Sequence, residues 1–308
     1  MNHLAIVRIL CIIGLILSSL MALNGLFAAA LDEYNYVFPF LLAVAVTGIP
    51  SAVILYLTNK PEQKTRATDG LAVAFLFWTV IPAFCAIPFI PLSGAGGWIS
   101  AYHEAVSCIT TTGHSALDMQ GAPMPASLLI WRAMLHMLGT VASITIAASV
   151  LAALNLGGPG IHKSRFFTIP EGNFFDTVPK IIRVSTVMTG TVALVLASLM
   201  LIVGVAPREA ISGAISAVST GLVDPNAAVT APAMGWAHTS ILSIGLVLGS
   251  LGLVVLDNLG KGQFMKVVGD PETITFFGSI AIVGSLAIFA GLPLLQASGW
   301  ALSSISTS

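Results

Sequence analysis

Charged side chains are scarce in this sequence of 308 residues. Asp, Glu, Lys and Arg together make up 8% of it and hydrophobic residues 56%, whereas roughly a quarter of an ordinary soluble domain is charged. So few charges cannot cover the surface of a soluble protein of this length. The net charge of −1 also gives no indication of a nucleic-acid partner. The composition therefore predicts an integral membrane protein surrounded by membrane lipid.

Cysteine and catalytic patterns are also scarce. Cys11, Cys85 and Cys108 lie in apolar stretches without a pairing pattern, so we expect free thiols. His103 and Glu104 resemble the start of a zinc-protease motif, but Ser107 stands where the second His is required. We therefore expect no enzyme and no cofactor in this chain.

Long apolar runs are plentiful. A helix needs about 20 apolar residues to cross ~30 Å of hydrocarbon. Seven runs fit: Leu4–Ala30, Val37–Thr58, Gly70–Leu92, Ala126–Leu154, Ile182–Ala206, Trp236–Leu256 and Ile274–Ala297. The first is too long for a cleaved signal peptide, so we expect it to be retained.

Most basic residues lie in connections on one side of the membrane, if the seven runs are its spans. Ten of the 12 Lys and Arg residues fall at the N-terminus or in alternate connections: Arg8, Lys60, Lys64, Arg66, Lys163, Arg165, Lys180, Arg183, Lys261 and Lys266. Cytoplasmic connections of membrane proteins carry such an excess. The sequence therefore predicts a cytoplasmic N-terminus.

Two connections on the opposite side, 93–125 and 207–235, are too apolar for solvated loops and too short to cross twice. Each contains one copy of a repeated pattern: a small residue, an aliphatic, Ser, a small residue, Ile or Val, Ser or Thr, then Thr. The copies are residues 105–113, 214–221 and 301–308. We predict re-entrant units of span, short pore helix, Thr/Gly-rich turn and span, because non-helical backbone at membrane depth must line a cavity or be buried.

The residue types in these turns fit an ion filter. Backbone carbonyls can replace the water shell of a dehydrated cation, glycine permits the backbone angles that align them, and Thr or Ser adds hydroxyl oxygens. Without a carboxylate inside any copy, a monovalent ion fits better than Ca²⁺ or Mg²⁺. Ser, Thr and Gly also serve ordinary helix packing, but three matching copies favour the filter. Its predicted ion-binding residues are Thr110, Thr111, Thr112, Gly113, Ser219, Thr220, Gly221, Ser306, Thr307 and Ser308.

Several charged or titratable residues lie near these turns. His114, Asp118 and Asp224 are candidates for an outer vestibule in which carboxylates concentrate cations, or for ordinary loop positions. Arg132 lies one turn inside a predicted span, where a charge is either functional or reaches back to the headgroups.

These features together resemble the Trk/Ktr/HKT superfamily of potassium transporters, and within it the bacterial TrkH type. The resemblance is carried by 69–89, by His103–Gly113, by Trp131–Met134 and by Leu156–Gly160. It implies an all-α membrane fold, potassium-channel-like, with an extra helix pair (1–60) followed by helix–pore helix–helix repeats at 61–160, 161–260 and 261–308. It also implies potassium as the substrate, a homodimer in the bacterial inner membrane and a cytoplasmic nucleotide-binding regulatory subunit of the TrkA/KtrA type.

The sequence departs from that pattern in three places. His136 and Gly139-Thr140 replace the usual Gln and Gly-Gly pair. The second turn is one residue shorter than the first, and we prefer a gap that aligns Gly221 with Gly113. The third copy stops at Ser308, from which we expect part of a longer protein, or else a half-size subunit. A non-conducting accessory subunit and a secondary transporter for another monovalent cation stay open as alternatives.

Overall fold

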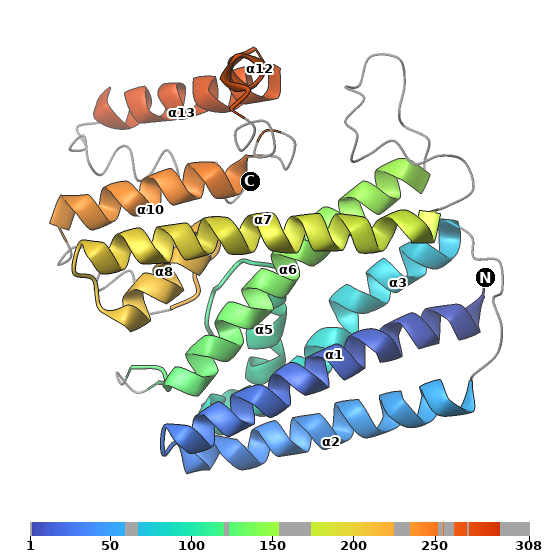
Figure 1. Ribbon diagram of the computed structural model, residues 1–308. Helices are drawn as coiled ribbons and strands as arrows, with labels where there is room; N and C mark the ends of the chain where they lie inside the picture. The colour runs from blue at the N-terminus through green and yellow to red at the C-terminus, as the bar shows by residue number, and fades with distance from the viewer. Residues whose placement is uncertain are drawn as a thin grey trace. The chain divides into compact units, whose positions relative to one another are not determined.

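The structure is a computed structural model that describes residues 2–58, 67–119, 123–153, 174–224, 235–251, 255, 262–269 and 271–289. Within these ranges every regular element is a helix (Figure 1), as the sequence predicts. Among the described residues, four helices are long and apolar enough to cross a membrane: His3–Ala30, Tyr34–Leu57, Ala126–Ala147 and Val178–Ile202. Shorter apolar helices lie in the other three predicted spans, at Asp69–Cys85, Ala237–Ser250 and Thr273–Val283.

The chain divides into two compact units. Unit 1 comprises Met1–Pro179 together with Val223–Pro225, and unit 2 comprises Lys180–Leu222 together with Asn226–Ser308. Unit 1 contains α1 (His3–Ala30), α2 (Tyr34–Leu57), α3 (Ala67–Thr79), α4 (Ile81–Cys85), the 3-10 helices η1 (Ile87–Leu92) and η2 (Gly94–Gly96), α5 (Gly97–Ile109) and α6 (Ala126–Ala153).

The first two helices form a hairpin. The connection between them is only three residues long, so α1 and α2 pack as neighbours (Figure 1). A β-carbon at Gly14 of α1 would lie 2.5 Å from the hydroxyl oxygen of Ser51 in α2. A β-carbon at Gly48 of α2 would lie 2.4 Å from the hydroxyl oxygen of Ser18 in α1. Small residues allow this close backbone approach, which is how membrane helices commonly associate.

Glu33, at the tip of the hairpin, connects it to α6. Its carboxylate accepts hydrogen bonds from the backbone N–H groups of Ala126 (2.8 Å) and Ser127 (3.0 Å) and from the Ser127 hydroxyl. The first N–H groups of a helix have no partner within the helix, and the helix dipole there favours a negative charge. The carboxylate therefore caps α6 and attaches the hairpin to the first repeat.

The third predicted span is not one continuous helix. The sequence predicts a single span at Gly70–Leu92, whereas the structure divides this stretch into α3, α4 and η1. Pro82 is the second residue of α4, Pro88 is the second residue of η1, and Pro91 lies inside η1. Proline has no N–H to donate and its ring clashes with the preceding turn, which explains the interruptions.

Unit 2 holds most of α7 (Phe174–Ile202) together with α8 (Pro207–Ser219), α10 (Gly235–Ser250), α12 (Phe264–Val268) and α13 (Pro271–Phe289). Small and aliphatic side chains of α7 and α8 form its core: Ala193, Leu196, Ala214, Ala217 and Val218. Gly245 of α10 packs against this core, since a β-carbon there would lie 2.7 Å from Leu196 and 2.8 Å from Ala217. The short helix α8 is therefore enclosed between two longer ones.

Large apolar side chains cover much of the surface of the long helices. Leu194 and Ile202 of α7 are 69% and 79% exposed, and Tyr56 of α2 is 84% exposed. Such surfaces would be unfavourable in water and suit hydrocarbon. The boundaries between the helix pair and the three repeats, and the cytoplasmic N-terminus, stay predictions.

Candidate functional site

The first predicted filter turn follows the short helix α5. The Ser107 carbonyl accepts hydrogen bonds from the backbone N–H groups of Thr112 (2.9 Å) and Gly113 (3.1 Å). Thr111 and Gly113 have φ angles of 58° and 79°. Left-handed residues let a chain reverse at a helix end while N–H groups cover the last carbonyls. The chain thus folds back on the end of α5.

Hydroxyl oxygens gather at the exposed side of this turn. Thr110 donates its hydroxyl to the Val106 carbonyl at 2.9 Å, and its oxygen lies 3.0 Å from that of Thr112. Thr110 and Thr112 are exposed, whereas Gly113 is buried. The C-terminal end of a helix also carries partial negative charge. Neutral oxygens beside a helix C-terminus form an environment that attracts a cation.

A buried ion pair lies directly behind the turn. Glu104 of α5 and Arg132 of α6 pair through Oε1 and Nη1, and both side chains are 0% exposed. The other carboxylate oxygen of Glu104 accepts from the Ser115 hydroxyl (2.9 Å) and the Ala116 backbone N–H (3.2 Å). Glu104 therefore holds the segment that leaves the first turn.

The remaining donors of Arg132 bind two carbonyls from distant parts of the sequence. Nη2 donates to Gly113 at 2.9 Å and Nε donates to Val223 at 2.7 Å. Val223 belongs to unit 1 with Arg132, and the negative charge of Asp224 also acts on the guanidinium. We predicted an ion-binding role for Gly113; in the structure its carbonyl faces Arg132, and its positive φ shapes the turn.

The second predicted filter turn follows α8 in unit 2. Thr220 has a φ angle of 54° and donates its N–H to the Ala217 carbonyl at 3.3 Å, as Thr111 does to Cys108 at 3.0 Å. The Gly221 N–H donates to the Ser216 carbonyl at 3.1 Å. These bonds correspond to those of the first turn without a gap.

The structure thus corrects the expected alignment of the two turns. Without a gap, Gly221 corresponds to Thr112 and Leu222 to Gly113. A positive φ occurs at Gly113 and not at Leu222, because a side chain disfavours the left-handed region. The two turns share their beginning and differ at this last position. The ion-binding roles of Ser219, Thr220 and Gly221 stay predictions.

A glycine of the following long helix approaches the end of each short helix. In α6, a β-carbon at Gly139 would overlap the Ile109 carbonyl oxygen. In α10, a β-carbon at Gly249 would lie 2.7 Å from the Val218 carbonyl oxygen. Ile109 and Val218 correspond in the repeat, so each unit builds the same contact by itself.

The three vestibule candidates lie in different environments. His114 is exposed and packs edge-to-face against His103, with ring centroids 5.4 Å apart. Asp118 is exposed and its N–H donates to the Leu92 carbonyl at 2.9 Å. Asp224 is only 7% exposed, and its negative charge acts on Arg132. The vestibule roles of His114, Asp118 and Asp224 stay predictions.

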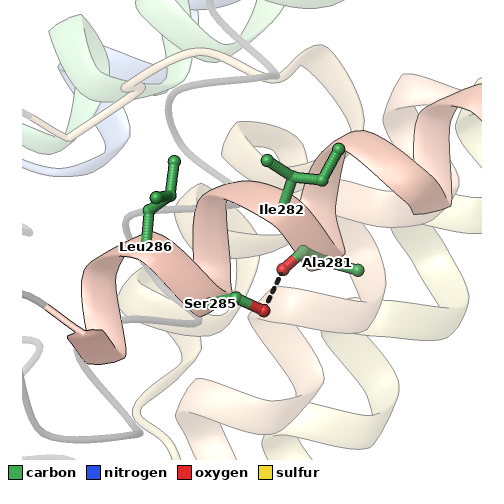
Figure 2. A pocket seen from close by; sticks show the side chains of 4 residues that line it. All are labelled: Ala281, Ile282, Ser285 and Leu286. Atoms are coloured by element: carbon green, nitrogen blue, oxygen red, sulfur yellow. Dashed lines mark hydrogen bonds between the residues drawn. The ribbon is translucent and has the colours of Figure 1, made fainter.

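The other candidate sites are weak. The third filter copy, Ser306–Ser308, lies outside the described residues. Within the described part of the chain, no group of three His, Cys, Asp or Glu side chains could hold a metal ion. Figure 2 shows a hollow along α13 lined by Ala281, Ile282, Ser285 and Leu286. The Ser285 hydroxyl donates to the Ala281 carbonyl at 2.7 Å (Figure 2), so we assign no ligand to this hollow.

The Glu104–Arg132 pair is the feature that sequence reasoning missed. The local sequence around each residue does not indicate that the two side chains meet. The signal was present, because each is a lone charge in an otherwise apolar helix. A charge at membrane depth needs a partner of opposite sign, and these two helices are neighbours in the chain.

Sequence comparison identifies relatives of this chain. No protein-family profile matches the sequence. The "Trk system potassium uptake protein TrkH" of Salmonella typhimurium is 25% identical over 289 residues, which is 90% of this chain and 58% of that protein. The protein of the same name from Halomonas elongata is 30% identical over 128 residues, or 41% of this chain and 26% of that protein. The chain is a relative of TrkH-type subunits.

The fold agrees with this relationship. A crystal structure described as the potassium transporter TrkH from Vibrio parahaemolyticus matches the whole chain with a TM-score of 0.80 at 19% identity, and the match covers 64% of that protein. The chain is therefore an all-α integral membrane protein with the TrkH fold, as predicted. It spans less than two thirds of each of these TrkH relatives.

Proposed function

We propose that this chain forms part of a potassium uptake pathway, in which Thr110–Gly113 is one strand of a selectivity filter and Ser219–Gly221 is another. The observation that carries the proposal is the turn after α5, where exposed threonine hydroxyls and left-handed backbone lie at the C-terminus of a short helix. The relationship to TrkH over 90% of the chain supports potassium as the ion.

The proposed mechanism uses neutral oxygens only. Carbonyl and hydroxyl oxygens replace part of the hydration shell of K⁺, and the helix dipole of α5 makes the site favourable for a cation. An inside-negative membrane potential then draws K⁺ inward at about 2.3 kcal/mol per charge for each 100 mV. The membrane potential is sufficient to drive this uptake, and no second ion is required. We therefore prefer uptake of K⁺ alone to symport with another ion.

The predicted assembly belongs to the same proposal. We place the chain in a bacterial inner membrane with a cytoplasmic N-terminus, supported by the distribution of Lys and Arg. A homodimer, a cytoplasmic nucleotide-binding regulatory subunit and a third filter strand at Ser306–Ser308 are supported by the TrkH resemblance alone.

A non-conducting accessory subunit is the second candidate. Leu222 favours it, because it stands where the first turn has Gly113 and does not adopt the corresponding backbone angle. A ring of filter strands needs comparable carbonyl geometry from each strand.

Complementation of a bacterium that lacks potassium uptake tests the proposal. We expect the complete gene product containing this chain to restore growth at low potassium and to take up Rb⁺, a K⁺ tracer. Gly113→Asp should abolish uptake, because it places a carboxylate and a strained backbone in the turn. Thr112→Val, which removes one oxygen at nearly constant shape, should lower uptake.

The matched control is Ala95→Asp, which introduces the same carboxylate at an exposed position of the same connection and should retain uptake. Normal uptake by a well-expressed Gly113→Asp protein would refute the filter assignment. A wild-type protein that inserts but moves no Rb⁺ would instead favour the accessory subunit.

A further inference from the structure

We infer that Glu104 and Arg132 act as positioning residues that set the ion selectivity of the filter. This inference rests on the proposed function. The guanidinium of Arg132 binds the Gly113 carbonyl at the end of the first turn and the Val223 carbonyl just after the second. One buried side chain therefore holds the exit of the first turn and the residue that follows Leu222 in the sequence.

The geometry of the pair explains why arginine occupies this site. Guanidinium presents its donors in a rigid planar fork, which can bind several acceptors at defined angles. Here the Arg132 guanidinium pairs with the Glu104 carboxylate and donates hydrogen bonds to two backbone carbonyls. Lysine would keep the positive charge, but its single ammonium on a flexible chain cannot reproduce this arrangement.

Burial makes a purely packing role a poor explanation. Both side chains are 0% exposed, and apolar residues of similar volume often serve a packing role at least as well as a buried ion pair. The hydrogen bonds of Glu104 and Arg132 instead go to Gly113, Ser115, Ala116 and Val223. Three of these four belong to the segment that contains the first turn and its exit.

Selectivity depends on how these carbonyls are directed. The Gly113 carbonyl faces Arg132, and the residue has a φ angle of 79°. This peptide therefore directs its oxygen into the protein and limits how far the oxygens of Thr111 and Thr112 can move. In the size-fit account of selectivity, K⁺ is preferred over the smaller Na⁺ when the oxygens do not close freely around the smaller ion.

Uptake measurements with conservative variants test the inference. Arg132→Lys and Glu104→Gln are introduced into the complete gene product. For each variant, uptake of K⁺ and Na⁺ is measured in proteoliposomes, and thermal stability is measured separately. We expect the K⁺/Na⁺ uptake ratio to fall by about tenfold, the scale of one lost hydrogen bond to a charged group, while total monovalent cation uptake persists. Arg208→Lys in the first turn of α8 is the matched control and should keep the wild-type ratio.

Each outcome of these measurements either supports the inference or overturns it. If both variants insert and keep the wild-type ratio, the inference is overturned and the proposed function stands. Lower stability and uptake at an unchanged ratio would assign a structural role only and also overturn it. If Arg132→Lys fails to insert, Glu104→Gln carries the test, and failure of both to insert overturns the inference. A wild-type protein that moves neither ion refutes the proposed function itself.

Discussion

At the scale of single residues, Gly139 shows how tightly α6 packs against the end of α5. The backbone of α6 contacts the last carbonyl of α5 at this point, and no β-carbon fits between them. That carbonyl lies directly before the filter turn, so the contact fixes the height of the turn against α6. Interiors packed to this density tolerate little added volume.

Gly139→Ala should therefore destabilise the protein. We expect the free energy of unfolding to fall by about 1–3 kcal/mol, the usual penalty for overpacking, and the melting temperature in detergent to fall with it. Gly190→Ala is the control, because a β-carbon at Gly190 meets no atom within 4 Å and alanine is the better helix former. Equal melting temperatures for the two variants would contradict the contact.

At the scale of elements, the two short helices α5 and α8 show what a sequence repeat does and does not determine. Each has 13 residues, ends in a turn with a left-handed threonine and lies against a glycine of the next long helix. The repeated residues impose this common geometry. The turns differ at Leu222 and Gly113, where the repeat itself is broken.

Leu222→Gly should make the second turn more like the first. Glycine removes the penalty of about 1–2 kcal/mol for a left-handed residue, so the population of that backbone state rises by about 5- to 30-fold. We expect a higher K⁺/Na⁺ uptake ratio in the proteoliposome assay. Leu222→Ala is the matched control, since it removes the side chain without freeing the backbone. The same change in both variants would show that side-chain size, not backbone freedom, is responsible.

At the scale of the whole molecule, the predicted topology makes a direct experimental claim. Apolar runs and the placement of Lys and Arg predict that residues 93–125 face outward and that the connection containing Gln263 faces the cytoplasm. Cys11, Cys85 and Cys108 are all buried, so these three thiols should add little background labelling with a thiol reagent.

Single cysteines test this topology. Ala116 and Gln263 are both exposed, and we expect a membrane-impermeant maleimide to label Ala116→Cys in intact cells. Gln263→Cys should be labelled only after permeabilisation. Labelling of Gln263→Cys in intact cells would invert the topology and with it the direction of uptake.

The sequence by itself determined the features that depend on local composition. Hydropathy and charge placement were sufficient for the all-α membrane fold and the seven apolar stretches, and the repeat located both short helices. The sequence contains the prolines that divide α3 from α4 and η1. Hydropathy alone does not predict these interruptions, because the run stays apolar throughout.

Only the tertiary structure decided which groups meet. Arg132 binds carbonyls of Gly113 and Val223, which lie 19 and 91 residues away in the sequence, and Glu33 caps a helix that begins 93 residues later. The direction of a carbonyl depends on backbone angles and on partners from other helices, and neither is written in the local pattern. The sequence therefore indicated where the proposed filter turns lie, and the fold decided which backbone oxygens Arg132 holds.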